Sequence, residues 1–219
     1  MEKKLLYIIT ARGGSKRLPN KNIKLFCNKP LLHWTVIQAL RVAKSNAVVL
    51  STEDLQIKKK CKPFKSLKLI HRPKKLASSK ASSIDVIRHV LKKMNFEGNV
   101  ILLQPTSPLR SDSDILKGIK LLNNHPAVIS QTLFRHDAFK INKNLKTPYF
   151  NPLSKKKLDL AIPNGAFFGA TTKWIKNNNS FFTKSVITFN MPYHRSVDID
   201  YEIDFIIAEK LFKNNNTKV

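Results

Sequence analysis

The chain has 219 residues, of which 42% are hydrophobic, and carries a formal net charge of +26. This length fits one large domain, or one domain with a small lobe, and is enough for a substantial buried core. No apolar run approaches the ~20 residues of a transmembrane helix, and the N-terminus lacks the apolar region of a signal peptide, so we expect a cytoplasmic protein without a membrane partner. Cys27 and Cys61 lack the spacing of metal ligands, so neither a metal site nor a disulfide is predicted from them.

The positive charge has two interpretations. Between Asp54 and Asp85 there is no acidic residue, while lysines are crowded together. A basic surface of this kind is the electrostatic footprint of a nucleic-acid-binding protein. The alternative is compositional drift, because Lys, Asn and Ile are abundant together. The lysines lack the interleaved aromatic residues of a single-strand-binding surface, which favours drift with mild attraction of anions. Nucleic acid is therefore not an expected partner.

Strands and helices alternate along the chain. Pro30 begins the first expected helix, which runs to Ala43, and apolar residues at helical spacing predict further helices at 83–94, 111–122, 173–177 and 200–212. Short apolar runs predict strands at 4–9, 47–50, 67–70, 100–103, 127–130, 166–168 and 186–189. This alternation is typical of an α/β fold in which a mainly parallel sheet lies between two layers of helices.

The pattern breaks from Thr132 to Pro163. Polar residues, a run of three lysines at 155–157 and several prolines interrupt any period there. A long segment without clear elements is usually functional or forms an interface. We expect residues 1–219 to be one domain in which 132–163 is an inserted arm.

Residues 11–22 follow the first apolar run and predict a phosphate-binding loop. Gly13 and Gly14 permit a positive φ or a close approach of the backbone to an anion. Successive backbone N–H groups in such a loop can surround an anion. The loop carries four cationic side chains: Arg12, Lys16, Arg17 and Lys21. Its spacing matches neither a Walker A loop nor the dinucleotide-binding Gly-x-Gly-x-x-Gly motif.

Further polar groups follow later strands. Gln104, Thr106 and Arg110 lie in a proline-rich stretch where a strand ends, which is where open α/β sheets bind ligands; a polar turn without a ligand is the alternative. The hydroxyl pair Ser82 and Ser83 opens a helix, and its simplest interpretation is a helix N-cap.

Asp198 and Asp200 are the candidate metal ligands. Alternation in an extended segment places both carboxylates on one side. Carboxylate oxygens suit Mg²⁺, which bridges protein carboxylates to substrate phosphates. An acidic helix N-terminus is the alternative, and it accounts for Glu202 and Asp204.

Five segments together resemble the CMP-N-acetylneuraminic acid synthetase (acylneuraminate cytidylyltransferase) family, in family order across almost the whole chain. They are A-R-G-G-S-K-R-L-P-N-K-N, R-P-K-K-L-A-S followed by S-S, L-L-Q-P-T-S-P-L-R, P-N-G-A-F-F and S-V-D-I-D-Y-E-I-D-F. The resemblance implies a sheet of the nucleotide-diphospho-sugar transferase (Rossmann-like) type and a homodimer formed through the inserted arm. It also implies formation of a CMP-sugar from CTP and an acidic nine-carbon sugar, most readily N-acetylneuraminic acid, with release of pyrophosphate.

The residues and the resemblance together give a set of expected site residues. The catalytic set is Arg12, Lys16 and Asp200, and the metal set, for Mg²⁺ or Mn²⁺, is Asp198 and Asp200. The nucleotide-binding set is Arg12, Gly13, Gly14, Ser15, Lys16, Lys21, Asn22, Arg72 and Ser83. The sugar-binding set is Gln104, Asn164 and Gly165.

Departures from the family pattern leave alternatives open. Ser79 and Lys80 replace an acidic-polar pair, and Ile162 lies where an arginine often precedes Pro-Asn-Gly in sialic acid enzymes. The alternatives are activation of another acid sugar (legionaminic, pseudaminic or 3-deoxy-octulosonic acid) and a non-catalytic relative, including one that binds nucleic acid.

Overall fold

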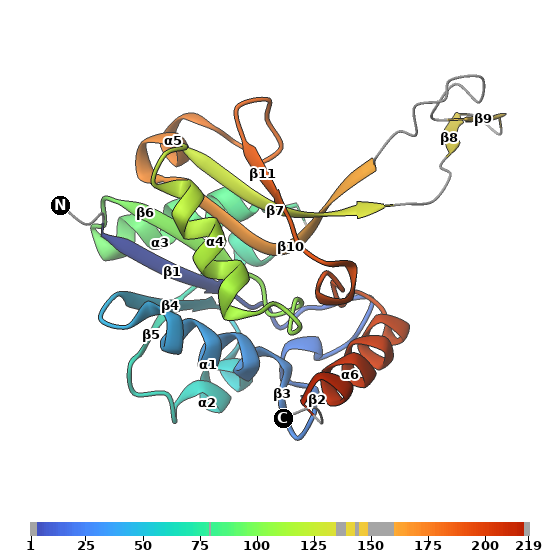
Figure 1. The fold of residues 1–219 in the computed structure, drawn as a ribbon. Coiled ribbons are helices and arrows are strands. Elements are labelled where there is room, and N and C mark those ends of the chain that lie inside the picture. Colours follow the sequence, from blue (N-terminus) through green and yellow to red (C-terminus); the bar gives the residue numbers. More distant parts are fainter. Residues whose placement is uncertain (1–3, 79, 135–138, 143–144, 149–159, 217–219) are drawn as a thin grey trace.

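A seven-stranded sheet with the strand order β11-β7-β10-β6-β1-β4-β5 forms the centre of the molecule (Figure 1). The structure is a computed structural model that describes residues 4–78, 80–134, 139–142, 145–148 and 160–216. The sheet consists of β1 (Leu5–Thr10), β4 (Ala47–Thr52), β5 (Leu67–His71), β6 (Asn99–Leu103), β7 (Ala127–Phe134), β10 (Leu160–Thr171) and β11 (Ile187–Asn190).

All of these strands run in one direction except β10, which is antiparallel to both of its neighbours, β6 and β7. From β1 the chain adds β4 and then β5 on one side, and returns to β6 on the other side of β1. The strand order therefore reverses between β1 and β6. In open α/β sheets, the crevice at the carboxyl ends of such strands is the usual ligand site.

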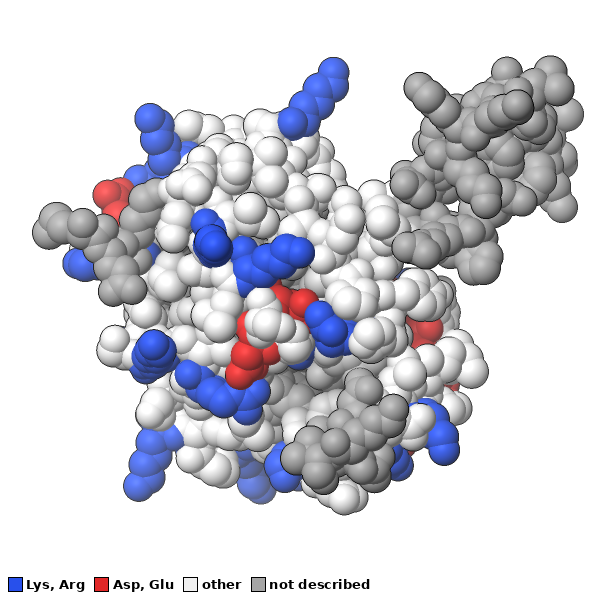
Figure 2. Space-filling model, in the orientation of Figure 1, with Lys and Arg blue, Asp and Glu red and all other residues white. Residues whose placement is uncertain are grey.

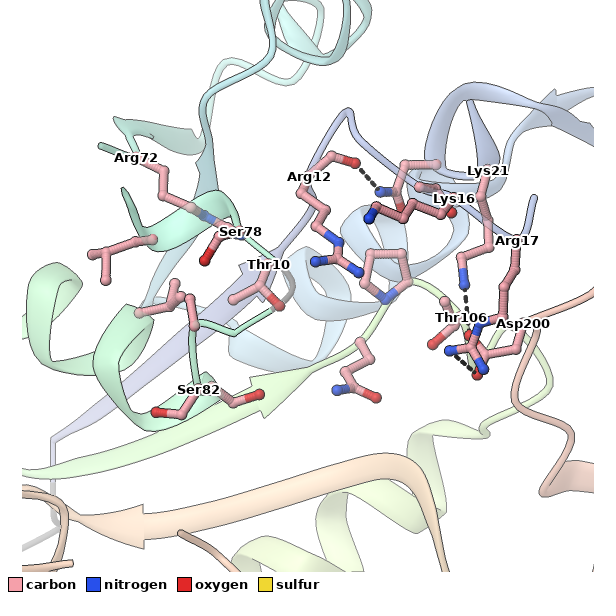
Figure 3. Close-up of a pocket in the computed structure, with 18 of the residues that line it drawn as sticks. Thr10, Arg12, Lys16, Arg17, Lys21, Arg72, Ser78, Ser82, Thr106 and Asp200 are labelled. Carbon is pink, nitrogen blue, oxygen red and sulfur yellow. Dashed lines mark hydrogen bonds and ion pairs between the residues drawn. The ribbon is translucent and has the colours of Figure 1, made fainter. Parts of the chain in front are cut away.

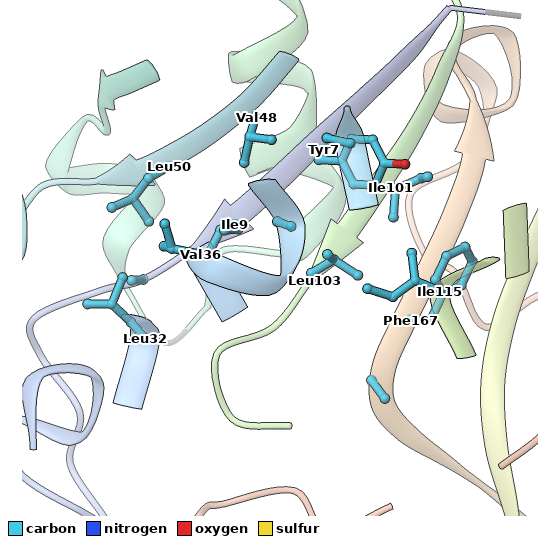
Figure 4. Packing of buried hydrophobic residues seen from close by; sticks show 14 of the residues in the cluster. Tyr7, Ile9, Leu32, Val36, Val48, Leu50, Ile101, Leu103, Ile115 and Phe167 are labelled. Atoms are coloured by element: carbon cyan, nitrogen blue, oxygen red, sulfur yellow. The ribbon is translucent and has the colours of Figure 1, made fainter. Parts of the chain in front are cut away.

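Helices cover both faces of the sheet, which makes three layers. On one face, side chains of α1 (Leu31–Ala43), α2 (Leu55–Cys61) and α4 (Asp112–Leu122) pack against Tyr7, Ile9, Leu50 and Leu103 (Figure 4). On the other face, α3 (Ser83–Met94) and α5 (Thr172–Asn177) cover the alternate residues of the same strands. The strands are buried on both faces, which explains why they are continuous apolar runs in the sequence.

A third apolar cluster fixes the C-terminal helix α6 (Glu202–Asn216) beside the first loop. The short hairpin of β2 (Leu25–Phe26) and β3 (Lys29–Pro30) presents Phe26 to α6. The Phe26 ring contacts Phe205 and Phe212 edge-on, with centroids 5.4 Å apart in both pairs. Leu18 and Ile199 belong to the same cluster, so the first loop and the segment before α6 share one core.

The expected fold class is confirmed: the sheet is mainly parallel and lies between helical layers. The helix predicted at 83–94 has those bounds, and the N-cap at Ser111 forms with a reciprocal bond to Asp114. Several strands are longer than predicted; β10 begins at Leu160, whereas we expected a strand only from Ala166. The short 3₁₀ helices at Lys21–Ile23, Lys74–Ala77 and Tyr193–Arg195 were not predicted.

The expected absence of regular structure from Thr132 to Pro163 was wrong for the residues at both ends of this segment. β7 continues to Phe134, and Thr132 pairs with Ile162 of β10. Backbone hydrogen bonds between β7 and β10 stabilise these strand ends, and the polar local sequence did not indicate this pairing. Further along, β8 (Phe139–Asn142) pairs with β9 (Leu145–Pro148). The remainder of the expected arm, 135–138, 143–144 and 149–159, lies outside the described residues.

The side chain of Arg110 connects helix α1 to strand β10 inside the core. Its guanidinium donates to the Ala166 carbonyl of β10 at 2.6 Å, and to Gln38 at 3.0 Å and Thr35 at 3.2 Å on α1. Only 3% of the residue is exposed. This burial lowers the pKa of Arg110 to about 10. We had placed Arg110 among the polar groups of a ligand loop, but its partners are the fold itself.

Replacing Arg110 should destabilise the protein strongly. Arg110→Met fills similar space but leaves the Ala166 carbonyl and the Gln38 amide oxygen without their donors, at about 1–3 kcal/mol for each buried acceptor. We expect the free energy of unfolding, measured in urea, to fall by about 3 kcal/mol. The control Arg41→Ala removes an exposed ion pair with Asp112 and should cost less than about 1 kcal/mol. Equal losses in the two variants would contradict this role.

Candidate active site

A cavity of about 600 Å³ opens at the carboxyl ends of β1, β5 and β6. Its walls come from the first loop (11–22), from the residues that follow β5 and β6, from the start of α3 and from the segment that precedes α6. The lining residues are Thr10, Arg12, Ser15, Lys16, Arg17, Lys21, Asn22, Arg72, Leu76, Ser78, Ala81, Ser82, Ser83, Val86, Gln104, Pro105, Thr106, Asp198 and Asp200. The first loop and Asp200, nearly the full length of the chain apart, thus line one cavity.

The cavity has two ends with basic side chains between them. Figure 3 shows Arg72, Ser78 and Ser82 on one side, and Thr106, Asp200 and Arg17 on the other. Arg12 and Lys16 lie between these groups. A ligand that fills the cavity would therefore meet hydroxyl and apolar groups at one end, cations in the middle and carboxylates at the far end.

Hydrogen bonds to neighbouring elements hold the first loop in place. The N–H of Gly13 donates to Glu53 at 2.8 Å, and the side-chain amide of Asn22 donates to the Arg12 carbonyl at 2.9 Å. A Cβ on Gly13 would lie 2.2 Å from a carboxylate oxygen of Asp54, so any other residue here would have to displace the side chain that caps α2. Neither Gly13 nor Gly14 has the positive φ that we had considered, and Gly14 has open space around it.

The end formed by β5 and α3 combines a buried arginine with a helix N-terminus. Arg72 is 4% exposed, and its guanidinium donates to the hydroxyl and carbonyl of Ser51. Burial lowers the pKa of Arg72, while the charge of Glu53 opposes this shift. Ser82 is the N-cap of α3 and accepts from the Asp85 N–H at 3.1 Å. The N-cap interpretation therefore holds for Ser82, while Ser83 also lines the cavity.

The opposite end holds Asp198 and Asp200. Asp200 accepts from Lys21 at 3.0 Å and forms an ion pair with Arg17 at 2.8 Å. Lys21, which we had expected to contact nucleotide, also donates to the Ile199 carbonyl and so joins the first loop to this segment. The Ile199 N–H in turn donates to the Thr106 carbonyl at 2.9 Å.

Asp198 lines the cavity in an environment that disfavours its charge. Desolvation of the carboxylate by the surrounding protein raises the pKa of Asp198, and the neighbouring charge of Asp200 raises it further. A hydrogen bond with Thr106 acts in the opposite direction. Two carboxylates that repel one another at a cavity wall form a place where a cation would be stabilised.

Gly165 allows the expected sugar-binding residues to come close to Asp198. Its φ of +72° is unfavourable for other residues, and an added Cβ would lie 2.7 Å from the Gln104 side-chain oxygen and 3.1 Å from an Asp198 carboxylate oxygen. Asn164 is buried and its amide is already engaged: the oxygen accepts from Ser130, and the nitrogen donates to Ser196 at 2.9 Å. Asn164 thus supports the segment before Asp198, whereas Gln104 faces the cavity.

The residues present fit a hard divalent cation that is shared with a substrate. Asp198 and Asp200 offer carboxylate oxygens, and Mg²⁺ is commonly held by one or two carboxylates together with phosphate and water. No group of three or more histidine, cysteine, aspartate or glutamate side chains arranged to hold a metal occurs in the part of the chain that the structure describes. The protein alone therefore supplies an incomplete ligand set, which substrate phosphates would complete.

The expected site residues are mostly brought together. Of the expected set, the cavity is lined by Arg12, Ser15, Lys16, Lys21, Asn22, Arg72, Ser83, Gln104, Asp198 and Asp200. Gly13, Gly14, Asn164 and Gly165 do not line it. The expected set omitted Arg17, Thr106 and Ser82, although each had been noted in a motif. The departure at Ile162 lies on β10 with 46% of the residue exposed, and Ser79 is outside the described residues.

The positive charge is not concentrated into one stripe on the face shown in Figure 2. Lysine and arginine side chains are scattered across this face, and acidic side chains gather near its centre. Among the described helices, none is long and apolar enough to cross a membrane.

Replacing Asp198 by asparagine and replacing Asp200 by asparagine should change the stability of the protein in opposite directions. Because the pKa of Asp198 is raised in the folded protein, the folded state binds more protons than the unfolded state in the window between the two pKa values, and stability falls as pH rises through it. Asp198→Asn should therefore raise Tm at pH ~7, with no gain below the unfolded aspartate pKa of ~3.9. Asp200→Asn removes the negative charge that Lys21 and Arg17 neutralise and should lower Tm. An Asp198→Asn protein with the wild-type Tm at neutral pH would contradict the raised pKa of Asp198.

The chain is similar in sequence to known cytidylyltransferases. The cytidylyltransferase family matches residues 6–215. N-acylneuraminate cytidylyltransferase of Escherichia coli O18:K1:H7 is 31% identical over 99% of this chain, which spans 54% of that enzyme. CMP-N,N'-diacetyllegionaminic acid synthase of Legionella pneumophila is 31% identical over 97% of both chains. Pseudaminic acid cytidylyltransferase of Campylobacter jejuni is 31% identical over 97% of this chain and 98% of its own.

Solved structures show the same fold. CMP:2-keto-3-deoxy-manno-octonic acid synthetase in complex with CTP has a TM-score of 0.75 at 17% identity, covering 97% of this chain and 99% of its own. The 4-diphosphocytidyl-2C-methyl-D-erythritol synthase of Anaerococcus prevotii has a TM-score of 0.72 at 16% identity, covering 96% of both chains. Since the family match extends over nearly all of the sequence, this chain belongs to the cytidylyltransferase family and is a nucleotidyltransferase.

Proposed function

We propose that this enzyme forms a CMP-sugar from CTP and an acidic nine-carbon sugar of the nonulosonic class, with release of pyrophosphate. The observation that carries the proposal is the cavity that places Arg12 and Lys16 between a hydroxyl-lined end and the Asp198/Asp200 end. This order of groups matches the order of a nucleoside, a triphosphate and an acid sugar. The names of the related enzymes support the same class of reaction.

The nucleoside would occupy the end formed by Arg72 and the start of α3. Leu76, Ala81 and Val86 supply apolar contacts there, and Ser83 supplies a hydroxyl at the helix N-terminus. Backbone N–H groups at the start of a helix also favour a negatively charged ligand nearby. Arg72 is held in position by Ser51 before any ligand arrives, so little side-chain entropy is lost on binding.

The reaction is a displacement at the α-phosphorus of CTP. The anomeric hydroxyl of the sugar forms the new O–P bond, the bond between the α-phosphorus and the bridging oxygen breaks, and the hydroxyl proton passes to water. Arg12 and Lys16 would neutralise the charge that gathers on the pyrophosphate as it leaves. Most of the acceleration in such transfers comes from positioning and charge stabilisation, which agrees with a cavity that no histidine lines among the described residues.

Asp198 and Asp200 would hold Mg²⁺ or Mn²⁺. When bound, such an ion neutralises phosphate oxygens and lowers the pKa of a coordinated hydroxyl. The contribution of this chain is to fix the two carboxylates: Asn164 anchors Ser196, and the Thr106 carbonyl accepts from Ile199. Both anchors flank Asp198, so the carboxylate is held before substrate enters.

The acid sugar would lie beside Gln104 and Gly165. Because Gly165 has no side chain, the Gln104 amide and the Asp198 carboxylate remain open to a ligand there. Three relatives of equal identity name three different acids, so the proposal is made for the class. N-acetylneuraminic acid is the acid to test first, followed by legionaminic, pseudaminic and 3-deoxy-octulosonic acids.

The test is pyrophosphate release measured with CTP and each acid in turn, with and without Mg²⁺. We expect one nonulosonic acid to give CTP-dependent turnover that requires the divalent cation. Replacing CTP by UTP should reduce the rate, because the hydroxyl-lined end would hold the base. Absence of turnover with every acid, in protein that binds CTP, would contradict the proposal.

Removal of Asp200 should reduce turnover strongly. We expect Asp200→Ala to lower kcat by about 10²–10³-fold, by analogy with the loss of one preorganised stabilising group. The matched control is Glu97→Ala, which removes a carboxylate from an exposed ion pair with Lys176. Measurements at saturating Mg²⁺ with unchanged turnover in Asp200→Ala would rule out the metal assignment.

A further inference from the structure

Asp200 has two cationic partners that differ in how firmly they are held. The Lys21 side chain is 11% exposed, and it also donates to the Ile199 carbonyl. The Arg17 side chain is 55% exposed and pairs with the other carboxylate oxygen of Asp200 at 2.8 Å. Lys21 is thus part of the core of this junction, while Arg17 approaches Asp200 from solvent.

Tyr201 provides the remaining support for Arg17. The Arg17 guanidinium lies over the Tyr201 ring, 5.2 Å from its centroid. A hydrogen bond with Tyr201 and the charge of Asp200 both raise the pKa of Arg17. Tyr201 immediately precedes α6, so this contact joins the tip of the first loop (residues 13–17) to the C-terminal helix.

The tip of the loop has few other attachments. Within residues 13–17, the described backbone hydrogen bonds are one from Ser15 to the Gly13 carbonyl and one from Gly13 to Glu53. Gly14 has no heavy atom within 4 Å of an added Cβ. The next firm anchor is Leu18, which is 4% exposed in the cluster beneath α6. The Arg17 side chain therefore holds the tip against the Asp200 segment.

We propose that Arg17 is a displaceable counter-cation for Asp200, and that a divalent cation replaces it before the first loop closes on nucleotide. The inference rests on the proposed function, because it concerns the same carboxylate pair. A metal ion at Asp200 must compete with Arg17 for one carboxylate oxygen, while Lys21 keeps its second partner at Ile199. Once displaced, Arg17 remains beside the cavity that Arg12 and Lys16 also line, where it can face phosphate.

Arg17 is accordingly a positioning residue with two states. Before the divalent cation binds, Arg17 neutralises Asp200 and keeps the tip of the first loop against α6. After a cation takes its place, the tip is free to move onto the triphosphate. Cation binding would therefore precede loop closure, because the loop would close on nucleotide only after the carboxylates have bound their cation.

The test uses Mn²⁺ alone, measured by electron paramagnetic resonance on the full chain without nucleotide. We expect Arg17→Ala to bind Mn²⁺ about 2–5-fold more tightly than wild type, the range that corresponds to losing one competing exposed ion pair. Arg17→Lys retains a charge at Asp200 and should lie near wild type.

Lys16→Ala is the matched control for charge alone. It also removes one positive charge from an exposed residue of the same loop, but no described hydrogen bond or ion pair joins the Lys16 side chain to Asp200. We expect its effect on Mn²⁺ affinity to be clearly smaller than that of Arg17→Ala. Equal effects of the two variants would overturn the displacement and leave only general electrostatics.

Hydrogen exchange of residues 13–17 gives a second readout that does not depend on activity. In wild type, Mn²⁺ alone should speed exchange of the tip, and Mn²⁺ with CTP should slow it. In Arg17→Ala, exchange should be fast already and insensitive to Mn²⁺ alone. A tip whose exchange does not respond to Mn²⁺ in wild type would overturn the proposal.

The metal assignment at Asp200 and the role of Arg17 can be refuted separately. If Asp200→Asn does not weaken Mn²⁺ binding, the metal assignment in the proposed function is wrong, and the displacement falls with it. If Mn²⁺ binding depends on Asp200 but is the same in wild type and Arg17→Ala, the metal site stands and the role of Arg17 is wrong.

Discussion

The buried guanidinium of Arg110 is the constraint on which the geometry of the site depends. It joins α1, through Thr35 and Gln38, to the Ala166 carbonyl of β10. Ala166 directly follows Gly165, the residue that leaves room for Gln104 and Asp198. An arginine provides several donors in a fixed plane, so one side chain can set the spacing between a helix and a strand. An apolar side chain would fill the same space without fixing that spacing.

A second set of contacts brings the end of the chain to its beginning. The segment from Ser196 to Asp200 lies between a 3₁₀ helix and α6, and three of its attachments reach different parts of the fold: Asn164 holds Ser196, the Thr106 carbonyl accepts from Ile199, and Lys21 holds Asp200. Beneath them, α6 packs on Phe26. The carboxylates therefore belong to a rigid segment although they precede a terminal helix.

The sequence predicts the elements of this fold well and the site in part. Runs such as Leu6–Ile9 are apolar because both sheet faces are covered, and the loops that follow them carry charge because they are open at one edge. Both Arg12 and Arg110 lie in loops that follow strands, and the sequence did not show that Arg12 lines the cavity whereas Arg110 is buried in the core. That difference depends on which partners surround each side chain in three dimensions. The same holds for Asn164, whose side-chain amide is hydrogen-bonded to Ser130 and Ser196. It also holds for the strand ends at Phe134 and Leu160, which depend on pairing across the sheet.

The two ends of the cavity differ in how much of their structure is fixed in advance. Around Arg72 and α3, capping bonds and buried partners hold each group, which suits a ligand that does not vary. At the other end, Gln104 has no described side-chain partner, and the missing side chain of Gly165 leaves space beside it. Under the proposed function, this difference would constrain the nucleotide firmly and the acid sugar weakly. Changes at the open end could then alter the choice of sugar without disturbing the nucleotide, and three relatives of equal identity are named for three different acids.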